Sequence, residues 1–86
     1  MHESSEMRRI EAVKARYQQS LLRRKNVVGV GIGFRERGGQ RTEELVLVVM
    51  VRQKQPRSAL RHRDLIPLEL DGVGVDVREV GTPRAL

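Results

Sequence analysis

The chain has 86 residues and no cysteine, which indicates one small domain that neither a disulfide nor a thiolate-bound metal can stabilise. Only Tyr17 and Phe34 are aromatic, so the core must be aliphatic, and so small a core favours self-association or docking onto a larger protein. The net charge of +6 favours polyanions or acidic protein surfaces, although a solvated arginine-rich surface is the more common explanation.

The N-terminal segment, from about residue 5 to residue 25, is typical of an amphipathic helix. Either Ser4 or Ser5 can cap its first turn. The segment lacks the apolar stretch of a signal peptide, and no run is long enough to span a membrane, so we expect a cytoplasmic protein without membrane contact. Its apolar residues recur at intervals of three and four and therefore share one face: Ile10, Val13, Tyr17 and Leu21.

A strand is predicted over residues 27–34, where side chains alternate between two faces. One face is wholly apolar, and it carries Val28, Val30, Ile32 and Phe34. The other is almost bare, because Gly29, Gly31 and Gly33 follow Val27 on it. Glycines in a strand often mark a close approach by another segment. We favour a helix or loop of the same chain in that place, with a ligand or a second chain as the alternative.

Gly38 and Gly39 then predict a hairpin turn, followed by a strand over residues 45–51 that is apolar on both faces. Such a strand is normally covered on both sides, yet a single helix covers only one. We therefore expect another molecule to cover the second face. The predicted partner-binding residues are Gly29, Gly31, Gly33, Val46, Val48 and Met50.

The remaining chain is less regular. Pro56 ends the second strand, and Ser58 can cap a short helical turn over residues 59–63. A short extended piece over residues 68–70 precedes a last strand with one apolar face, which carries Val73, Val75 and Val77. The predicted fold is an α+β two-layer sandwich, with the helix (5–25) on a small, mainly antiparallel sheet in a strand-rich core (26–81), followed by a tail (82–86). The expected element order is helix, strand, strand, short helix, strand.

The residues give little support to catalysis. The glycines at 29, 31 and 33 lie within a strand and precede a hairpin, whereas a dinucleotide fingerprint needs a turn that leads into a helix. The two histidines, His2 and His62, have no neighbours at metal-ligand spacing, and no serine or threonine lies at a strand-to-helix elbow. We predict that the chain is not an enzyme and binds neither a cofactor nor a metal.

Basic residues form several short clusters that could contact a polyanion through phosphate groups. Without aromatic platforms for bases, such contact would be non-specific and sensitive to salt. The candidate residues are Arg8, Arg9, Arg23, Arg24, Lys25, Arg61 and Arg63.

Three motifs together resemble the N-terminal domain of bacterial trypsin-like serine peptidases over about residues 26–86. They are the alternating glycines, the sequence DLIP at 64–67 and the sequence VDVREVG at 75–81. The peptidase part would begin near Leu86, so no catalytic residue of that family is carried over. The resemblance implies a non-catalytic interaction or oligomerisation module, which binds itself or regulates a larger partner such as a peptidase domain. The alternative is a basic nucleic-acid-associated protein.

Overall fold

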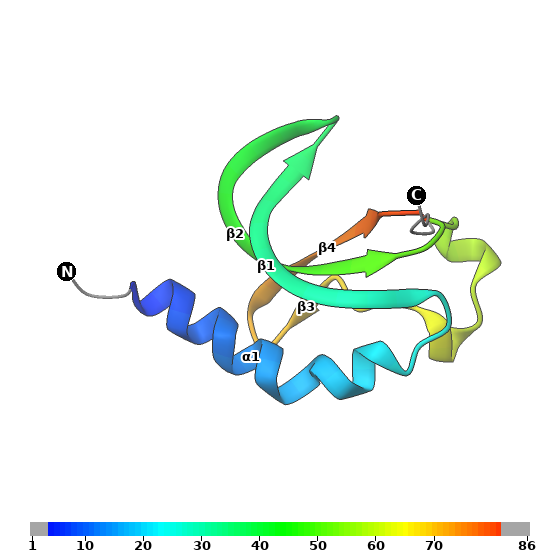
Figure 1. Cartoon of the computed structure of the whole chain (residues 1–86), viewed down its shortest axis with the longest axis horizontal. Coiled ribbons are helices and arrows are strands. Elements are labelled where there is room, and N and C mark those ends of the chain that lie inside the picture. The colour runs from blue at the N-terminus through cyan, green and yellow to red at the C-terminus, as the bar shows by residue number, and fades with distance from the viewer. Residues whose placement is uncertain (1–3, 82–86) are drawn as a thin grey trace, which may run out of the picture.

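The computed structural model describes residues 4–81 as one helix lying on one face of a four-stranded sheet (Figure 1). The sheet has the order β1-β2-β4-β3, and only β2 and β4 run parallel. The predicted α+β two-layer architecture is therefore confirmed. His2 and the predicted tail (82–86) lie outside the described residues. The elements are α1 (Ser5–Leu22), β1 (Val27–Arg37), β2 (Gln40–Val51), β3 (Glu69–Leu70) and β4 (Val73–Glu79).

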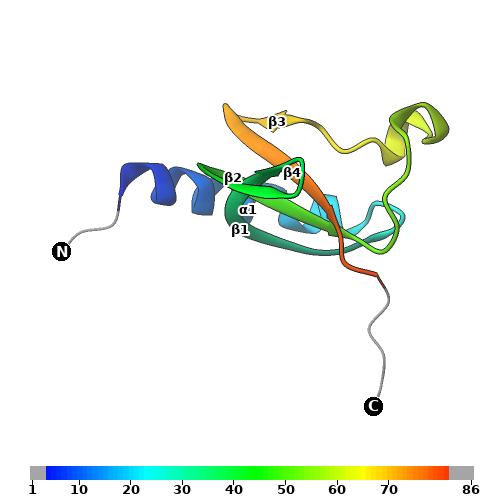
Figure 2. The same ribbon diagram turned by 90° about the horizontal axis from the view of Figure 1, so that it is seen from above.

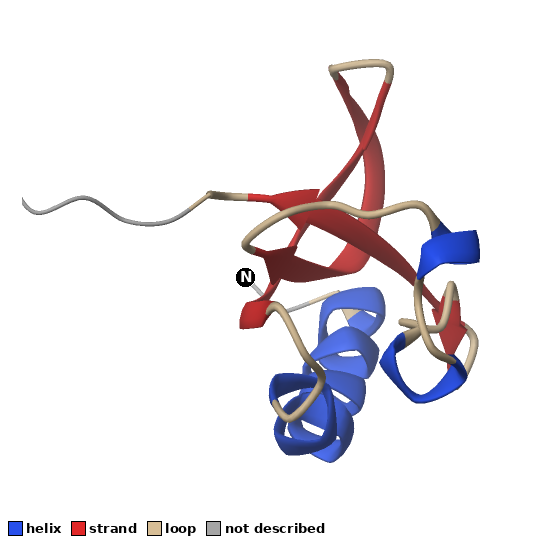
Figure 3. Cartoon of the chain, turned by 90° about the vertical axis from the view of Figure 1, so that its right-hand side faces the viewer, coloured by secondary structure: helices blue, strands red, loops and turns tan. Residues whose placement is uncertain are grey.

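Helix α1 lies against one face of the sheet (Figure 3), and its predicted apolar stripe packs into the core. Ser4 caps the helix, because its hydroxyl accepts a hydrogen bond from the Met7 N–H at 3.0 Å. The helix ends at Leu22, short of the predicted residue 25, and the chain reverses through Asn26 at a φ of 78°. Among residues 4–81, no helix combines the length and the apolar character that a bilayer crossing requires.

The core lies between α1 and one face of the sheet. Fully burying an aliphatic side chain of this size contributes about 1.5–3 kcal/mol, so these few residues dominate the stability of so small a domain. Tyr17, Val27, Val30 and Ile32 pack against its edge. The buried residues are Ile10, Val13 and Leu21 from α1, Leu47, Val49 and Val51 from β2, Ile66 from the crossover, and Val73 and Val75 from β4.

A β-bulge changes the predicted faces of β1 at its start. Val27 is opposite Val51 and Gly29 is opposite Met50, so β1 carries one extra residue there. Val27 consequently packs against the core, whereas Val28 is 43% exposed. The prediction that Val28 shares the core face of Val30 and Ile32 is wrong for this reason.

The sheet face opposite α1 is covered by the chain itself. The β1–β2 hairpin curls back over the sheet, which brings the end of β1 towards β4 (Figure 1). There the Glu36 N–H donates to Asp76 Oδ2 at 3.0 Å, and the Arg78 guanidinium donates to the Phe34 carbonyl. As a result Val46 is 0% exposed and Val48 5% exposed. At Val46 and Val48 the cover is therefore the chain itself, whereas the expectation that another molecule covers this face stays a prediction for Met50.

The glycines of β1 make room for side chains of β2 on that same face. A Cβ added at Gly29 would lie 3.0 Å from Met50 Cε, and one added at Gly33 would lie 3.4 Å from Val48 Cγ2. The close approach that the glycines predict is thus intramolecular. It comes from side chains of the neighbouring strand and not from a crossing helix or loop.

The connections follow the predicted turns in part. Gly38 and Gly39 form the hairpin turn, both with positive φ, at 57° and 79°. The crossover from β2 to β4 contains two 3-10 turns, Arg57–Ala59 and His62–Asp64, in place of the single predicted helical turn. Leu60 and Arg61 between them are extended, so helical hydrogen bonding cannot continue from one turn to the next.

The turn between β3 and β4 is tied to α1 by polar contacts. The Tyr17 hydroxyl donates to Asp71 Oδ1 at 2.9 Å, and Arg16 Nη1 lies 3.1 Å from Asp71 Oδ2. Arg9 Nη2 donates to the Asp71 carbonyl at 3.2 Å. Asp71 therefore ties the body of α1 to the β3–β4 turn.

A first prediction concerns the crowding at Gly33. In Gly33→Val, the branched side chain meets Val48 and the Arg78 guanidinium, so we expect a loss of about 1–3 kcal/mol in the free energy of unfolding. Gly31→Ala is the control, because its Cβ would lie at an ordinary 3.6 Å from Met50 Cε. Urea denaturation measures both variants. Equal stability of Gly33→Val and the wild type would contradict the packing described.

A second prediction concerns Tyr17, the single tyrosine of the chain. The hydrogen bond to Asp71, more than burial, raises the pKa of Tyr17 above its ordinary value of 10.0. Folding then favours the protonated phenol. The contribution of this hydrogen bond to the free energy of unfolding is therefore complete below the ordinary pKa, and it is lost as the pH rises through the folded-state pKa.

Titration of tyrosinate absorbance tests this directly. Asp71→Asn should lower the pKa of Tyr17, since the acceptor loses its charge while asparagine tolerates the positive φ of 50° at this position. Tyr17→Phe should show a smaller loss of stability at alkaline pH than the wild type. An unchanged pKa of Tyr17 in Asp71→Asn would show that the bond does not form.

Candidate functional site

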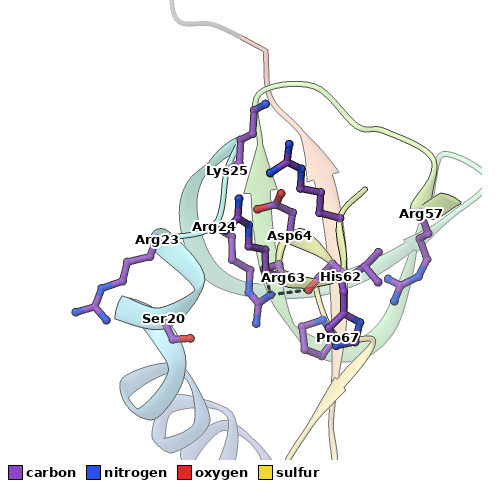
Figure 4. Close-up of a pocket in the computed structure, with 11 residues that line it drawn as sticks. Ser20, Arg23, Arg24, Lys25, Arg57, His62, Arg63, Asp64 and Pro67 are labelled. Carbon is purple, nitrogen blue, oxygen red and sulfur yellow. Dashed lines mark hydrogen bonds between the residues drawn. The ribbon is translucent and has the colours of Figure 1, made fainter. Parts of the chain in front are cut away.

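A wide cleft of about 1010 Å³ lies between the end of α1 and the crossover that joins β2 to β4 (Figure 4). Two views place the crossover at the end of the molecule where α1 finishes (Figures 1 and 2). Ser20, His62, Asp64, Leu65 and Pro67 line parts of the wall. The other lining residues are all basic: Arg23, Arg24, Lys25, Arg57, Arg61 and Arg63.

Asn26 holds the two walls of the cleft together at its base. Its side-chain carbonyl accepts the Gln53 N–H at 3.1 Å, and its amide group donates to the Gln53 carbonyl. The Asn26 carbonyl also accepts the Arg52 N–H at 2.9 Å. The start of the crossover is thereby fixed beside the end of α1, so the basic residues of both segments face a common space.

Two of the basic residues bind the crossover backbone. Arg24 Nη1 donates to the carbonyls of Arg63, at 2.8 Å, and Leu65, at 2.7 Å, and it thus spans from the helix end to the loop (Figure 4). Arg57 Nη1 donates to the Ile66 carbonyl at 2.9 Å. The buried Arg24 Nε has no hydrogen-bond partner. These two arginines shape the cleft, and because carbonyls carry no charge, neither contact within residues 4–81 is an ion pair.

The cleft concentrates the net charge of the chain. Six basic residues against the single carboxylate of Asp64 leave +5 there, out of +6 for the whole sequence. No ion pair involves Arg23, Lys25, Arg61 or Arg63 within residues 4–81. Elsewhere arginines do pair: Arg35 with Glu44 at 2.8 Å, Arg16 with Asp71 at 3.1 Å, and Arg78 with Asp76 at 3.2 Å.

The structure divides the predicted polyanion-contact residues into two groups. Five of them gather in the cleft: Arg23, Arg24, Lys25, Arg61 and Arg63. Arg8 and Arg9 lie in the first half of α1, where Arg9 binds the Asp71 carbonyl. Arg57 was missing from the predicted set, although its place in the same basic loop as Arg61 was a signal that could have included it.

The predicted partner-binding residues lie on the sheet face opposite α1, away from the cleft lining. Val46 and Val48 are buried there in the single chain, while Met50 lies over Gly29 and Gly31. Gly33 is half-buried beside Val48 and Arg78. In this conformation the two valines are enclosed by their own chain, so what this face presents to a partner is the glycine strand and Met50.

The chemistry available in the cleft is anion binding. Arginine presents a planar fork of donors that matches carboxylate and phosphate groups. Ser20 and His62 both line the cleft, but no hydrogen bond joins them in the described part of the chain. Within residues 4–81, no group of three histidine, cysteine, aspartate or glutamate side chains is arranged to hold a metal ion.

The comparison with known families corrects the resemblance drawn from the sequence motifs. The chain matches the family described as the NARROW LEAF 1 N-terminal domain over residues 5–80, and no curated protein matches it. The assignment to the N-terminal domain of bacterial trypsin-like serine peptidases is therefore wrong.

The motifs that suggested the peptidases have structural roles in this fold. The glycines admit Met50 and Val48, Asp76 accepts the Glu36 N–H, and Glu79 Oε1 accepts the Lys54 N–H at 2.8 Å. Such motifs specify a curled hairpin and its neighbouring strand. With 76 of its 86 residues covered by the match, the chain belongs to the NARROW LEAF 1 N-terminal domain family.

Proposed function

We propose that the chain is a non-catalytic protein-interaction domain, and that its basic cleft binds an acidic segment of a partner protein. The observation that carries the proposal is the charge of the cleft, where five of the six net positive charges of the chain lie together. Arg23, Lys25, Arg61 and Arg63 have no carboxylate partner in the described residues. An acidic segment would supply the missing counter-charges.

The strength of such contacts indicates a partner with several carboxylates. A solvent-exposed ion pair contributes only about 0.2–1 kcal/mol, so one carboxylate would bind weakly. Several cations on two facing walls can contact successive acidic side chains of one peptide. Their combined field also speeds the encounter with a partner of opposite charge.

The alternative of nucleic-acid binding has less support from the site. Binding of single strands relies on aromatic side chains that stack on bases. Tyr17 binds Asp71 in the β3–β4 turn, and Phe34 lies under Arg41, whose guanidinium carbon is 4.3 Å from the ring centre. Neither ring lines the cleft. Carboxylates need no stacking surface and therefore suit the cleft better.

Self-association through the apolar face of β2 is not part of the proposal. That hypothesis needed Val46 and Val48 to be available, and both are buried beneath the curled hairpin of the same chain. Interaction through the cleft instead uses the charged basic side chains that line it.

The third prediction tests the cleft by charge reversal. Arg61→Glu with Arg63→Glu should weaken binding of a fluorescent oligoglutamate peptide by about tenfold, because two attractive pairs of about 0.2–1 kcal/mol each become repulsive. The matched control is Arg37→Glu with Arg41→Glu, which changes the net charge equally beside the hairpin turn. Fluorescence anisotropy over a range of salt concentrations measures both.

Two outcomes would overturn the proposal. If both double variants lose the same affinity, the peptide responds to net charge alone and not to the cleft. If single-stranded DNA of equal charge binds much more tightly than the peptide, and Arg61→Glu with Arg63→Glu abolishes that binding, the cleft is a nucleic-acid site.

A further inference from the structure

A second, narrower cavity of about 220 Å³ adjoins the basic cleft, and the crossover and the sheet form its walls. We call it the apolar slot. Lys25, Arg57 and Asp64 line both the slot and the cleft and therefore form the boundary between them. Its apolar lining consists of Leu60, Ile66 and Leu68 from the crossover, Val51 from β2, and Val75 and Val77 from β4.

The slot is open to solvent and is large enough for one side chain. Leu68 is 63% exposed, although it contacts a space lined by aliphatic groups. A cavity of about 150 Å³ with such a lining is sufficient for a benzene-sized group. The slot therefore accommodates a side chain the size of leucine or phenylalanine, but it is too small for a typical drug-sized ligand, which occupies about 300–1,000 Å³.

The arrangement brings apolar and cationic groups to one place. The aliphatic walls favour a group that leaves water, while Lys25 and Arg57 outnumber Asp64 at the shared boundary and favour a negative charge there. A purely apolar ligand would leave the net positive charge of this boundary uncompensated. A purely acidic one would leave the exposed part of the aliphatic wall, such as Leu68, in contact with water. A ligand that carries both an apolar group and negative charge would bury the aliphatic walls and supply the counter-charge.

We propose that the partner segment carries one large apolar side chain between its acidic residues, and that this side chain enters the slot while the carboxylates contact the basic cleft. The inference rests on the proposed function, since it takes the partner to be an acidic protein segment. It adds a requirement on the sequence of the partner segment: one aliphatic or aromatic residue with acidic residues on both sides of it.

Two peptides of equal charge test the inference on the full chain. One is a short oligoglutamate with a single central leucine, and the other has serine at that position. The wild type should bind the leucine peptide about tenfold more tightly, as expected from burial of a leucine side chain. Leu60→Ser with Leu68→Ser should abolish this preference. Val28→Ser, a substitution of another exposed aliphatic residue on β1, should retain it.

The outcomes separate this inference from the proposed function. Equal binding of the two peptides to the wild type would overturn the inference and leave the acidic partner in place. A leucine preference that persists in Leu60→Ser with Leu68→Ser would also overturn it, because the apolar group would then bind elsewhere. Failure of both peptides to bind would overturn the proposed function itself. Circular dichroism of each variant checks that the fold is retained.

Discussion

The constraint on which the rest of the structure depends is that β2 is central in the sheet and apolar on both faces. One face is covered by α1, through Ile10, Val13 and Leu21. Residues 4–81 contain no second α-helix to cover the other face, and the β1–β2 hairpin curls over it instead (Figure 1). This curl requires that β1 carry few side chains on the face that turns towards the sheet. It also requires polar bonds that hold the end of β1 to β4. The glycines of β1 meet the first requirement, and Asp76 and Arg78 meet the second.

The basic cleft is a consequence of the same topology. Because β4 runs parallel to β2, the chain must cross from one end of the sheet to the other before β4 begins. The crossover passes the end of α1 and is held there by Asn26, Arg24 and Arg57, which bind backbone atoms of residues 52, 53, 63, 65 and 66. These polar bonds and the burial of Ile66 in the core attach this segment. Arg24 and Arg57, which hold the crossover in place, thus also contribute to the positive electrostatic field that an acidic partner would meet.

Local patterns were enough to predict the helix and the main strands, but not the two 3-10 turns of the crossover or the faces that depend on long-range contacts. The spacing of Ile10, Val13 and Leu21 identified the helix face, and Gly38-Gly39 identified the hairpin turn. The bulge at Val28 could not be predicted, because it depends on the register with β2. The curl depends on contacts between β1 and β4, which are separated by about half of the sequence.

The same distinction applies to the candidate site. The sequence identified Arg23 to Lys25 and the basic loop as separate clusters. Only the parallel crossover brings them to facing walls, so the charge density of the cleft is a property of the topology and not of either segment. The family was missed for a related reason, since glycine alternation and strand motifs report a backbone shape and not a particular partner.

The unpaired charges of the cleft themselves favour a ligand over a merely solvated surface. Crowded like charges destabilise a compact state, and a domain of this size has little stability in reserve. Elsewhere the chain avoids this problem: the Arg35 guanidinium bonds to Glu44 and lowers the pKa of that carboxyl, and Arg78 contacts both Asp76 and Glu36. In the cleft, six basic residues meet only Asp64. An anionic partner that binds the folded state would relieve this repulsion and stabilise the fold, by an amount that grows with the ratio of its free concentration to its Kd.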